Sequence, residues 1–274
     1  MTSTPSAQGK ALITGASSGI GAVYADRLAR RGYDLVLVAR REDRLRALAE
    51  RLEKETGRAI EIIGADLNEA GDRARVERVL RQDPALNLLV NNAGFASVAP
   101  LLEADVDAME AMIDLNVKAL TRLTYAAAPA FIARGNGTII NIASVVAVGP
   151  ERLNGVYGAS KAYVLAFSHS LQSELTDKGV RIQAVLPGAT ATDLWENAGL
   201  HYDNLPPEMV MSTDDMVDAA LAGLDQGELV TIPSLQDRAE WDRWEADRKA
   251  LSMRFAHSRP APRYAVAARE VEAA

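Results

Sequence analysis

The chain alternates between short runs of consecutive apolar, often β-branched residues and longer stretches in which apolar residues recur every three or four positions. Consecutive apolar positions are typical of strands that a parallel sheet buries on both faces, and the longer spacing is typical of the helices that connect such strands. The pattern therefore predicts an α/β fold. The predicted strands are residues 10–14, 34–39, 59–65, 86–91, 137–143, 181–186 and 228–232.

The stretches between these strands are predicted to be helices, among them residues 42–55 and 68–82, and the first helix is expected to begin near Gly19. Pro129 is predicted to bend or end a helix that begins near Asp105, because proline lacks the backbone donor that a helix interior needs.

Residues 189–212 break the rhythm, because they contain prolines and few apolar repeats. Such a long connection is usually either a functional lid or disordered, and we predict a substrate lid there. Residues 237–257 are predicted to form one more helix. No linker or internal repeat divides the chain, which predicts a single domain over residues 1–274, with a core over about 9–233 and a C-terminal helical extension over about 234–274.

Composition narrows the function classes. The 274 residues are 48% hydrophobic and 24% charged, as in an ordinary globular protein. With no cysteine and three histidines, neither a disulfide nor a bound metal is predicted. The net charge of -7 argues against nucleic acid and anionic membranes as partners. No stretch approaches the roughly 18 consecutive apolar residues of a membrane span, and residues 1–8 lack the features of a secretory signal, so a cytoplasmic location is predicted.

Residues 14–21, Thr-Gly-Ala-Ser-Ser-Gly-Ile-Gly, join the first predicted strand to the first predicted helix. Glycines there permit a tight turn, let the backbone approach a bound pyrophosphate, and leave the amides of the helix N-terminus facing that anion. This placement favours dinucleotide binding over a plain turn, although the glycine spacing differs from G-x-G-x-x-G.

The same turn has a second interpretation, because residues 15–19 also fit G-x-S-x-G, the elbow that exposes a nucleophilic serine, here Ser17. Asp193 with His201 or His257 would complete the triad of a hydrolase in the required order. An elbow on the first strand lies outside the usual plan of that fold, however, and both histidines fall in irregular or terminal segments. The hydrolase is therefore the less favoured alternative.

Arg40 and Arg41 follow the second predicted strand, with Arg44 one helical turn later. An acidic residue at that place would bind the ribose 2′-hydroxyl of NAD(H), whereas arginine accepts the 2′-phosphate of NADP(H). Two charge-assisted hydrogen bonds would give on the order of a hundredfold preference for NADP(H), the alternative being a solvated basic helix start. Asp66, after the third predicted strand, is a candidate acceptor for the adenine amino group or a helix-start residue.

Tyr157 and Lys161 are four residues apart and lie on one face of a predicted helix, while Ser144 follows the fifth predicted strand. To exchange protons near neutral pH, a phenol needs a pKa about 3 units below its usual value near 10. A lysine ammonium at about 4 Å would contribute up to about 4 kcal/mol at an effective dielectric constant of about 20, which is much of that shift. These residues are therefore candidates for proton exchange with a substrate oxygen.

Taken together, the motifs resemble the short-chain dehydrogenase/reductase family over about residues 9–233. The resemblance rests on the order, spacing and identity of the turn at 14–21, Asn-Asn-Ala-Gly at 91–94, Asn116, Ser144, the Tyr157 and Lys161 pair, and Pro187-Gly188. It implies a Rossmann-like, doubly wound, mainly parallel sheet of seven strands with helices on both faces. It also implies a homodimer or homotetramer that associates through helices near 105–133 and 157–178.

The resemblance assigns roles to individual residues. Tyr157 is expected to act as general acid/base, with Ser144 hydrogen-bonded to the substrate oxygen. Lys161 is expected to hold the nicotinamide ribose and lower the pKa of Tyr157, and Asn116 to position a water in the proton relay. The expected cofactor site comprises Gly15, Ser17, Ser18, Gly19, Ile20, Gly21, Arg40, Arg41, Asp66, Leu67, Asn92, Ala93, Gly94, Tyr157, Lys161, Pro187, Gly188, Thr190 and Thr192.

The sequence thus predicts an NADP(H)-dependent oxidoreductase that moves a hydride between the nicotinamide and a small-molecule carbonyl or secondary alcohol. A protein that binds NADP(H) without catalysis is the other alternative to be tested. The substrate pocket is expected to have an apolar lining that includes Val145, Val146, Leu153, Leu194 and Trp195.

Overall fold

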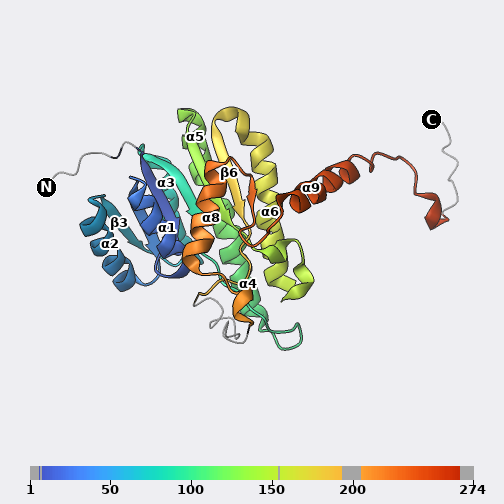
Figure 1. Ribbon diagram of the computed structural model, residues 1–274, viewed down its shortest axis with the longest axis horizontal. Coiled ribbons are helices and arrows are strands. Elements are labelled where there is room, and N and C mark those ends of the chain that lie inside the picture. The colour runs from blue at the N-terminus through green and yellow to red at the C-terminus, as the bar shows by residue number, and fades with distance from the viewer. Residues whose placement is uncertain (1–5, 7, 154, 193–204, 266–274) are drawn as a thin grey trace. The chain divides into compact units, whose positions relative to one another are not determined.

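The computed structural model describes residues 6, 8–153, 155–192 and 205–265, and the chain divides into two compact units, Met1–Ser234 and Leu235–Ala274, which we treat separately. The first unit contains one parallel sheet in the order β3-β2-β1-β4-β5-β6-β7. Figure 1 shows β3 and α2, in blue, at one edge of this unit. The strands are β1 (Lys10–Thr14), β2 (Asp34–Ala39), β3 (Ile60–Gly64), β4 (Leu86–Asn91), β5 (Gly137–Ile142), β6 (Val180–Val185) and β7 (Val230–Thr231).

Helices connect the strands and cover the sheet. Among the described residues of the first unit, the α-helices are α1 (Gly19–Arg30), α2 (Glu42–Thr56), α3 (Ala70–Gln82), α4 (Val106–Ile113), α5 (Leu120–Arg134), α6 (Gly155–Leu175) and α8 (Thr213–Asp225). Shorter helical segments are the π-helix η1 (Asp114–Ala119) and the 3₁₀ turns η2 (Val145–Ala147), η3 (Pro150–Arg152), η4 (Thr176–Lys178) and η6 (Pro207–Met209). The second unit contains α9 (Arg238–Ser252) and the 3₁₀ turn η7 (Pro262–Tyr264).

Successive residues of the longer strands enter different cores, which explains the consecutive apolar positions. Ala11 and Ile13 of β1 pack in a core with α1, α2 and α8, whereas Leu12 packs in a second core with α3, α5 and α6. The doubly wound, Rossmann-like α/β fold with seven strands is therefore confirmed. The strand order reverses between β1 and β4, and in such sheets ligands bind beyond the carboxyl ends of the strands at that point.

The predicted elements agree closely with the observed ones. Strands β1, β2 and β4 have the predicted bounds, and the other four strands differ by at most two residues. Pro129, by contrast, does not end its helix, because α5 continues to Arg134. Both Pro129 and Tyr125, whose carbonyl oxygen loses its donor, are exposed, so water can satisfy that oxygen. The irregularity lies earlier, at the π-helical residues Asp114–Ala119.

In the second unit, α9 begins after Asp237, whose side chain accepts a hydrogen bond from the backbone N–H of Ala239, and ends at Ser252, five residues before the predicted end. Trp241 and Trp244 stack with ring centres 4.6 Å apart. Among the described residues of both units, no helix has the length and apolar character needed to cross a membrane.

Candidate functional site

The turn between β1 and α1 is held by a side chain from the neighbouring strand. Asn92, directly after β4, donates from its amide to the carbonyl oxygens of Thr14 at 2.8 Å and Gly15 at 3.3 Å. The Thr14 hydroxyl accepts from the backbone N–H groups of Asn92 and Ala93, each at 3.0 Å. These bonds fix the turn against β4 and leave the first amides of α1 facing the crevice.

Glycine is required in this turn for two different reasons. Gly15 and Gly19 have φ values of +67° and +53°, in the left-handed region that side chains rarely adopt. Gly21 lacks space instead, since a Cβ there would lie 2.3 Å from the Gly15 carbonyl oxygen and 2.6 Å from the Asn92 amide nitrogen. The turn and the start of α1 therefore pack backbone against backbone.

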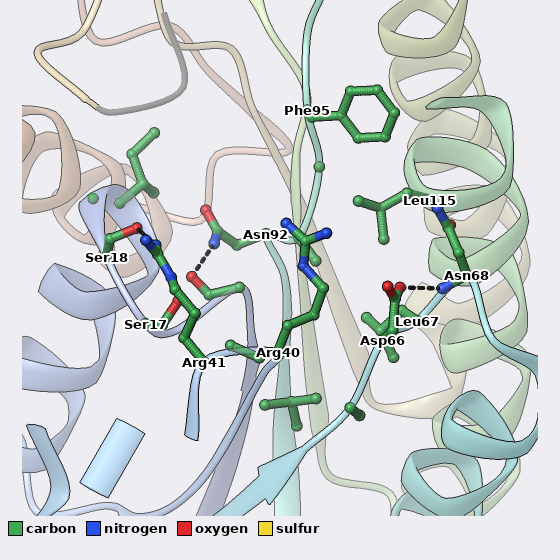
Figure 2. Close-up of a pocket in the computed structure, with 18 of the residues that line it drawn as sticks. Ser17, Ser18, Arg40, Arg41, Asp66, Leu67, Asn68, Asn92, Phe95 and Leu115 are labelled. Carbon is green, nitrogen blue, oxygen red and sulfur yellow. Dashed lines mark hydrogen bonds between the residues drawn. The ribbon is translucent and has the colours of Figure 1, made fainter. Parts of the chain in front are cut away.

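A cleft of about 540 Å³ opens beyond this turn. Figure 2 shows Arg40 and Arg41 extending into it from the end of β2, and the guanidinium of Arg41 donates to the Ser18 hydroxyl at 3.0 Å. Both arginines are exposed, so the basic charge stands at the rim of the cleft. The lining includes Gly15, Ser17, Ser18, Gly19, Ile20, Arg40, Arg41, Asp66, Leu67, Asn92, Ala93, Gly94 and Thr192, all predicted cofactor residues.

Asp66 lies on the opposite wall of the cleft from the glycine turn (Figure 2). Its carboxylate accepts from the backbone N–H of Asn68 at 3.0 Å, and its own N–H donates to Asp72 at 2.8 Å. The bonds to Asn68 and Asp72 fit the helix-start interpretation, and contact with the adenine amino group stays a prediction. Asp66 faces the cleft, and it also shapes the turn that precedes α3.

A second cavity, of about 70 Å³, is lined by three of the predicted catalytic residues. Ser144 reaches it from the end of β5 and Tyr157 and Lys161 from α6. The other predicted residues on its wall are Ile20, Asn92, Gly94, Pro187, Gly188, Thr190 and Thr192. Four of these, Ile20, Asn92, Gly94 and Thr192, also line the larger cleft, so the two cavities share a boundary.

Lys161 is buried and anchored to the strand that carries Ser144. Its ammonium donates to the carbonyl oxygen of Ile142 at 2.9 Å and lies 5.8 Å from the centre of the Tyr157 ring. Burial lowers the pKa of Lys161 to about 8, because a buried ammonium loses its hydration.

The Tyr157 phenol is also buried, with 5% of its surface exposed. Burial raises its pKa to about 12, and a side-chain hydrogen bond with Ser144 opposes that rise. In this geometry the loss of hydration outweighs the effect expected from Lys161, so the phenol stays protonated at neutral pH. Ser144 itself donates to the Pro187 carbonyl oxygen at 3.4 Å and accepts from the Val146 backbone N–H at 3.3 Å.

Asn116 lies in η1, outside both cavity walls. Its amide nitrogen donates to the Phe95 carbonyl oxygen at 2.9 Å and to the Ser160 hydroxyl at 3.1 Å, and its Oδ1 accepts from the Phe95 N–H at 3.1 Å. Both side-chain amide hydrogens are thus used within the protein, so of the side chain the second lone pair of Oδ1 is left to hold a water. The predicted water-positioning role remains a prediction.

The predicted substrate wall is partly described. Val146 is buried in an apolar cluster with Tyr157, Met109 and Met112, and Leu153 packs against that cluster. Val145 donates its backbone N–H to the Pro187 carbonyl oxygen at 3.0 Å. Leu194 and Trp195 lie outside the described residues, as does the middle of the predicted lid, 193–204.

Sequence reasoning missed two residues that connect the parts of the site. Phe95 lines the larger cleft and bonds Asn116 through its backbone. The Ser160 hydroxyl accepts from Asn116 and donates to the Tyr157 carbonyl oxygen at 2.8 Å. Both residues could have been found from their positions beside motifs. Phe95 follows Asn-Asn-Ala-Gly, and Ser160 lies between Tyr157 and Lys161.

Comparison with known proteins gives consistent matches. A family model described as short chain dehydrogenase matches residues 9–203. A short-chain dehydrogenase from Sphingobium yanoikuyae in complex with NADPH is 49% identical, with a TM-score of 0.91 over 93% of this chain and 99% of that one. The bulky-bulky ketone specific alcohol dehydrogenase from Comamonas testosteroni is 43% identical, with a TM-score of 0.86 over 96% and 99%. Sulfoacetaldehyde reductase 2 from Chromohalobacter salexigens is 40% identical over 66% of this chain and 73% of its own length.

Proposed function

The chain belongs to the short-chain dehydrogenase family, and we propose that it is an NADP(H)-dependent oxidoreductase that transfers a hydride between the nicotinamide and a carbonyl or secondary alcohol. The observation that carries this proposal is the convergence of Ser144, Tyr157 and Lys161 on one small cavity that adjoins the larger cleft. The serine hydrolase has less support among the described residues, since Ser17 lines the larger cleft, in the turn proposed to bind phosphate, and Asp193 and His201 lie outside those residues.

The residues present fit a dinucleotide. The glycine turn gives the backbone access that a pyrophosphate needs, and the side chain of Ser18, which precedes α1, makes no capping hydrogen bond to the helix. We assign the 2′-phosphate to Arg40 and Arg41 and the adenine side to Asp66 and Leu67. The NADPH complex of the Sphingobium relative supports this choice of cofactor. When bound, the cofactor supplies or accepts the hydride.

In the proposed reaction, the protein supplies the proton. Tyr157 is protonated at neutral pH and would donate its phenolic proton to a carbonyl oxygen during reduction, for which its pKa must fall from the value that burial gives it. Ser144 would hydrogen-bond the same oxygen and hold the phenol, with which it already bonds. The ammonium of Lys161 would stabilise the phenolate that remains after proton donation.

Other residues would position or enclose the site without taking part in proton transfer. Asn116 would position the Phe95 segment and α6 around the cavity, and Val145, Val146 and Leu153 would form part of an apolar substrate wall. The alcohol dehydrogenase from Comamonas, by its name specific for bulky ketones, supports such a wall. We also propose a cytoplasmic homo-oligomer.

Substitution of Tyr157 tests the proposal. Tyr157→Phe removes the proton and keeps the ring, so NADPH-dependent reduction of a ketone panel should fall by about a thousandfold or more, while NADPH binding stays within about twofold. Tyr163→Phe, on the same helix and outside both cavity walls, is the matched control and should keep its turnover. NADPH binding without any turnover in the wild-type protein would instead support the non-catalytic alternative.

A further inference from the structure

A chain of polar side chains runs through the core beneath the site. Asn91 of β4 donates from its amide to Thr124 of α5 at 3.1 Å and to Asn141 of β5 at 2.9 Å. Asn141 donates in turn to Ser168 of α6 at 3.0 Å. The Ser168 hydroxyl donates to the Val164 carbonyl oxygen at 2.8 Å. Each of the four linked side chains is at most 3% exposed.

The presence of these polar side chains in the core is not explained by packing alone. Burying amides and hydroxyls costs free energy that their hydrogen bonds only offset, and apolar residues of similar size would fill the same core. What polar groups add is directionality, because a hydrogen bond tolerates only small changes in distance and angle. These hydrogen-bonded side chains therefore specify how α5 and α6 sit on β4 and β5.

The link between Asn141 and Ser168 bears directly on the site. Asn141 immediately precedes Ile142, whose carbonyl oxygen accepts from Lys161 at 2.9 Å. Ser168 lies seven residues after Lys161, which is about two helical turns, so both side chains leave the same face of α6. Two hydrogen bonds, spaced about 10 Å apart along the helix, thus join one face of α6 to adjacent residues of β5.

We propose that Asn141 and Ser168 are a positioning pair that sets the register of α6 on β5 and thereby the placement of Tyr157 and Lys161 relative to Ser144. The bonds at Lys161 and Ser160 hold α6 near the site, and the bond at Ser168 fixes a point about two turns farther along the helix. That added constraint on the orientation of α6 matters because a misplacement of about 1 Å at reacting groups is enough to lower a rate by orders of magnitude. The catalytic consequence rests on the proposed function, whereas the structural consequence does not.

The test uses Ser168→Ala, which removes the hydroxyl and leaves the backbone of α6 intact. Its matched control is Thr231→Val, which breaks another buried amide-to-hydroxyl bond in the same sheet, between Gln183 and Thr231 at 2.9 Å. Thermal unfolding measures how much stability each variant loses when a buried hydrogen bond is removed. The kcat and KM for a ketone and the affinity for NADPH are then measured for both.

We expect Ser168→Ala to lower kcat by about tenfold with NADPH affinity unchanged within about twofold, and Thr231→Val to lose stability without that loss of kcat. An equal kcat in the two variants would overturn the catalytic consequence. The structural consequence has its own readout, because the rate at which acetic anhydride labels Lys161, followed by mass spectrometry, should rise in Ser168→Ala and not in Thr231→Val. If the wild-type protein reduces no ketone, the proposed function fails, and the labelling rates alone decide the positioning role. Equal labelling of Lys161 in all three proteins would refute it.

Discussion

The ammonium of Lys161 lies 5.8 Å from the centre of the Tyr157 ring, and burial moves the pKa values of the two groups in opposite directions. The pKa of Tyr157 rises to about 12 and that of Lys161 falls to about 8. Both groups therefore carry their protons at neutral pH. Burial keeps the proton on the phenol, and the buried ammonium of Lys161 makes the fold less stable.

The cost of burying Lys161 predicts a pH dependence of stability. Between pH 8 and 10.5 the unfolded chain holds more protons at this residue than the folded one, so the free energy of unfolding should rise with pH over that window. Lys161→Met removes the titrating group and keeps most of the volume. The stability of the wild type relative to Lys161→Met, from urea unfolding, should increase on the order of 3 kcal/mol across the window. A difference that does not change with pH would contradict the assigned pKa.

Cofactor preference is predicted to depend on the two arginines at the rim of the cleft. Arg40→Ala and Arg41→Ala should each weaken NADPH binding by about tenfold, because each removes a charge-assisted bond to the 2′-phosphate, and should leave NADH binding nearly unchanged. Fluorescence titration with NADPH and with NADH measures the two affinities of each variant. Arg46→Ala, on α2 and outside the cleft lining, controls for loss of positive charge. Equal losses for NADH and NADPH would exclude a phosphate-specific role.

The glycine turn gives a steric prediction. Gly21→Ala places a Cβ 2.3 Å from the Gly15 carbonyl oxygen, so the turn must open and NADPH affinity should fall by at least about tenfold. Gly71→Ala in α3 is the matched control, since nothing lies within 4 Å of its added Cβ. That variant should bind NADPH normally and gain a few tenths to about 1 kcal/mol of stability from helix propensity. Normal NADPH binding by Gly21→Ala would show that the turn is softer than its contacts indicate.

Self-association is predicted to involve an aromatic surface on α5 and α6. Tyr125, which is 69% exposed, stacks with Phe167, and Phe167 stacks with Tyr163. Exposed aromatic residues of this kind are common at protein interfaces. Light scattering after size exclusion should give the mass of a dimer or tetramer, and Tyr125→Glu should shift it toward the 29.4 kDa of one chain. A monomeric wild type would remove this prediction.

Features that depend on residues close together in the sequence could be predicted from it, whereas features that depend on distant residues could not. Strand positions were predictable because residues such as Leu12 and Ile13 are buried on opposite faces, which leaves an apolar run in the sequence. The Tyr157 and Lys161 pair was predictable from helical spacing. The π-helix around Asn116 was not, because no local pattern distinguishes it from an α-helix, and Asn116 bonds to Phe95 and Ser160, which are distant in sequence.

The balance of pKa effects at Tyr157 was also beyond the sequence. The residue types indicate that a lysine charge will lower the pKa of a phenol, but burial decides the sign, and burial depends on how α4, η2 and α6 close around the ring. The predicted cofactor residues, in contrast, fall largely on two adjoining cavity walls, because the carboxyl ends of parallel strands meet at one edge of a sheet.

The contact between Asn92 and the glycine turn has a practical consequence for protein engineering. The Asn92 amide lies within 2.8 Å of the Cβ that a side chain at either Gly15 or Gly21 would carry, so these three positions cannot vary independently. Grafting a turn from another protein to alter cofactor use should therefore fail when the turn is moved by itself. A transplant that carries the segment after β4 together with the turn preserves the brace and has the better prospect of folding.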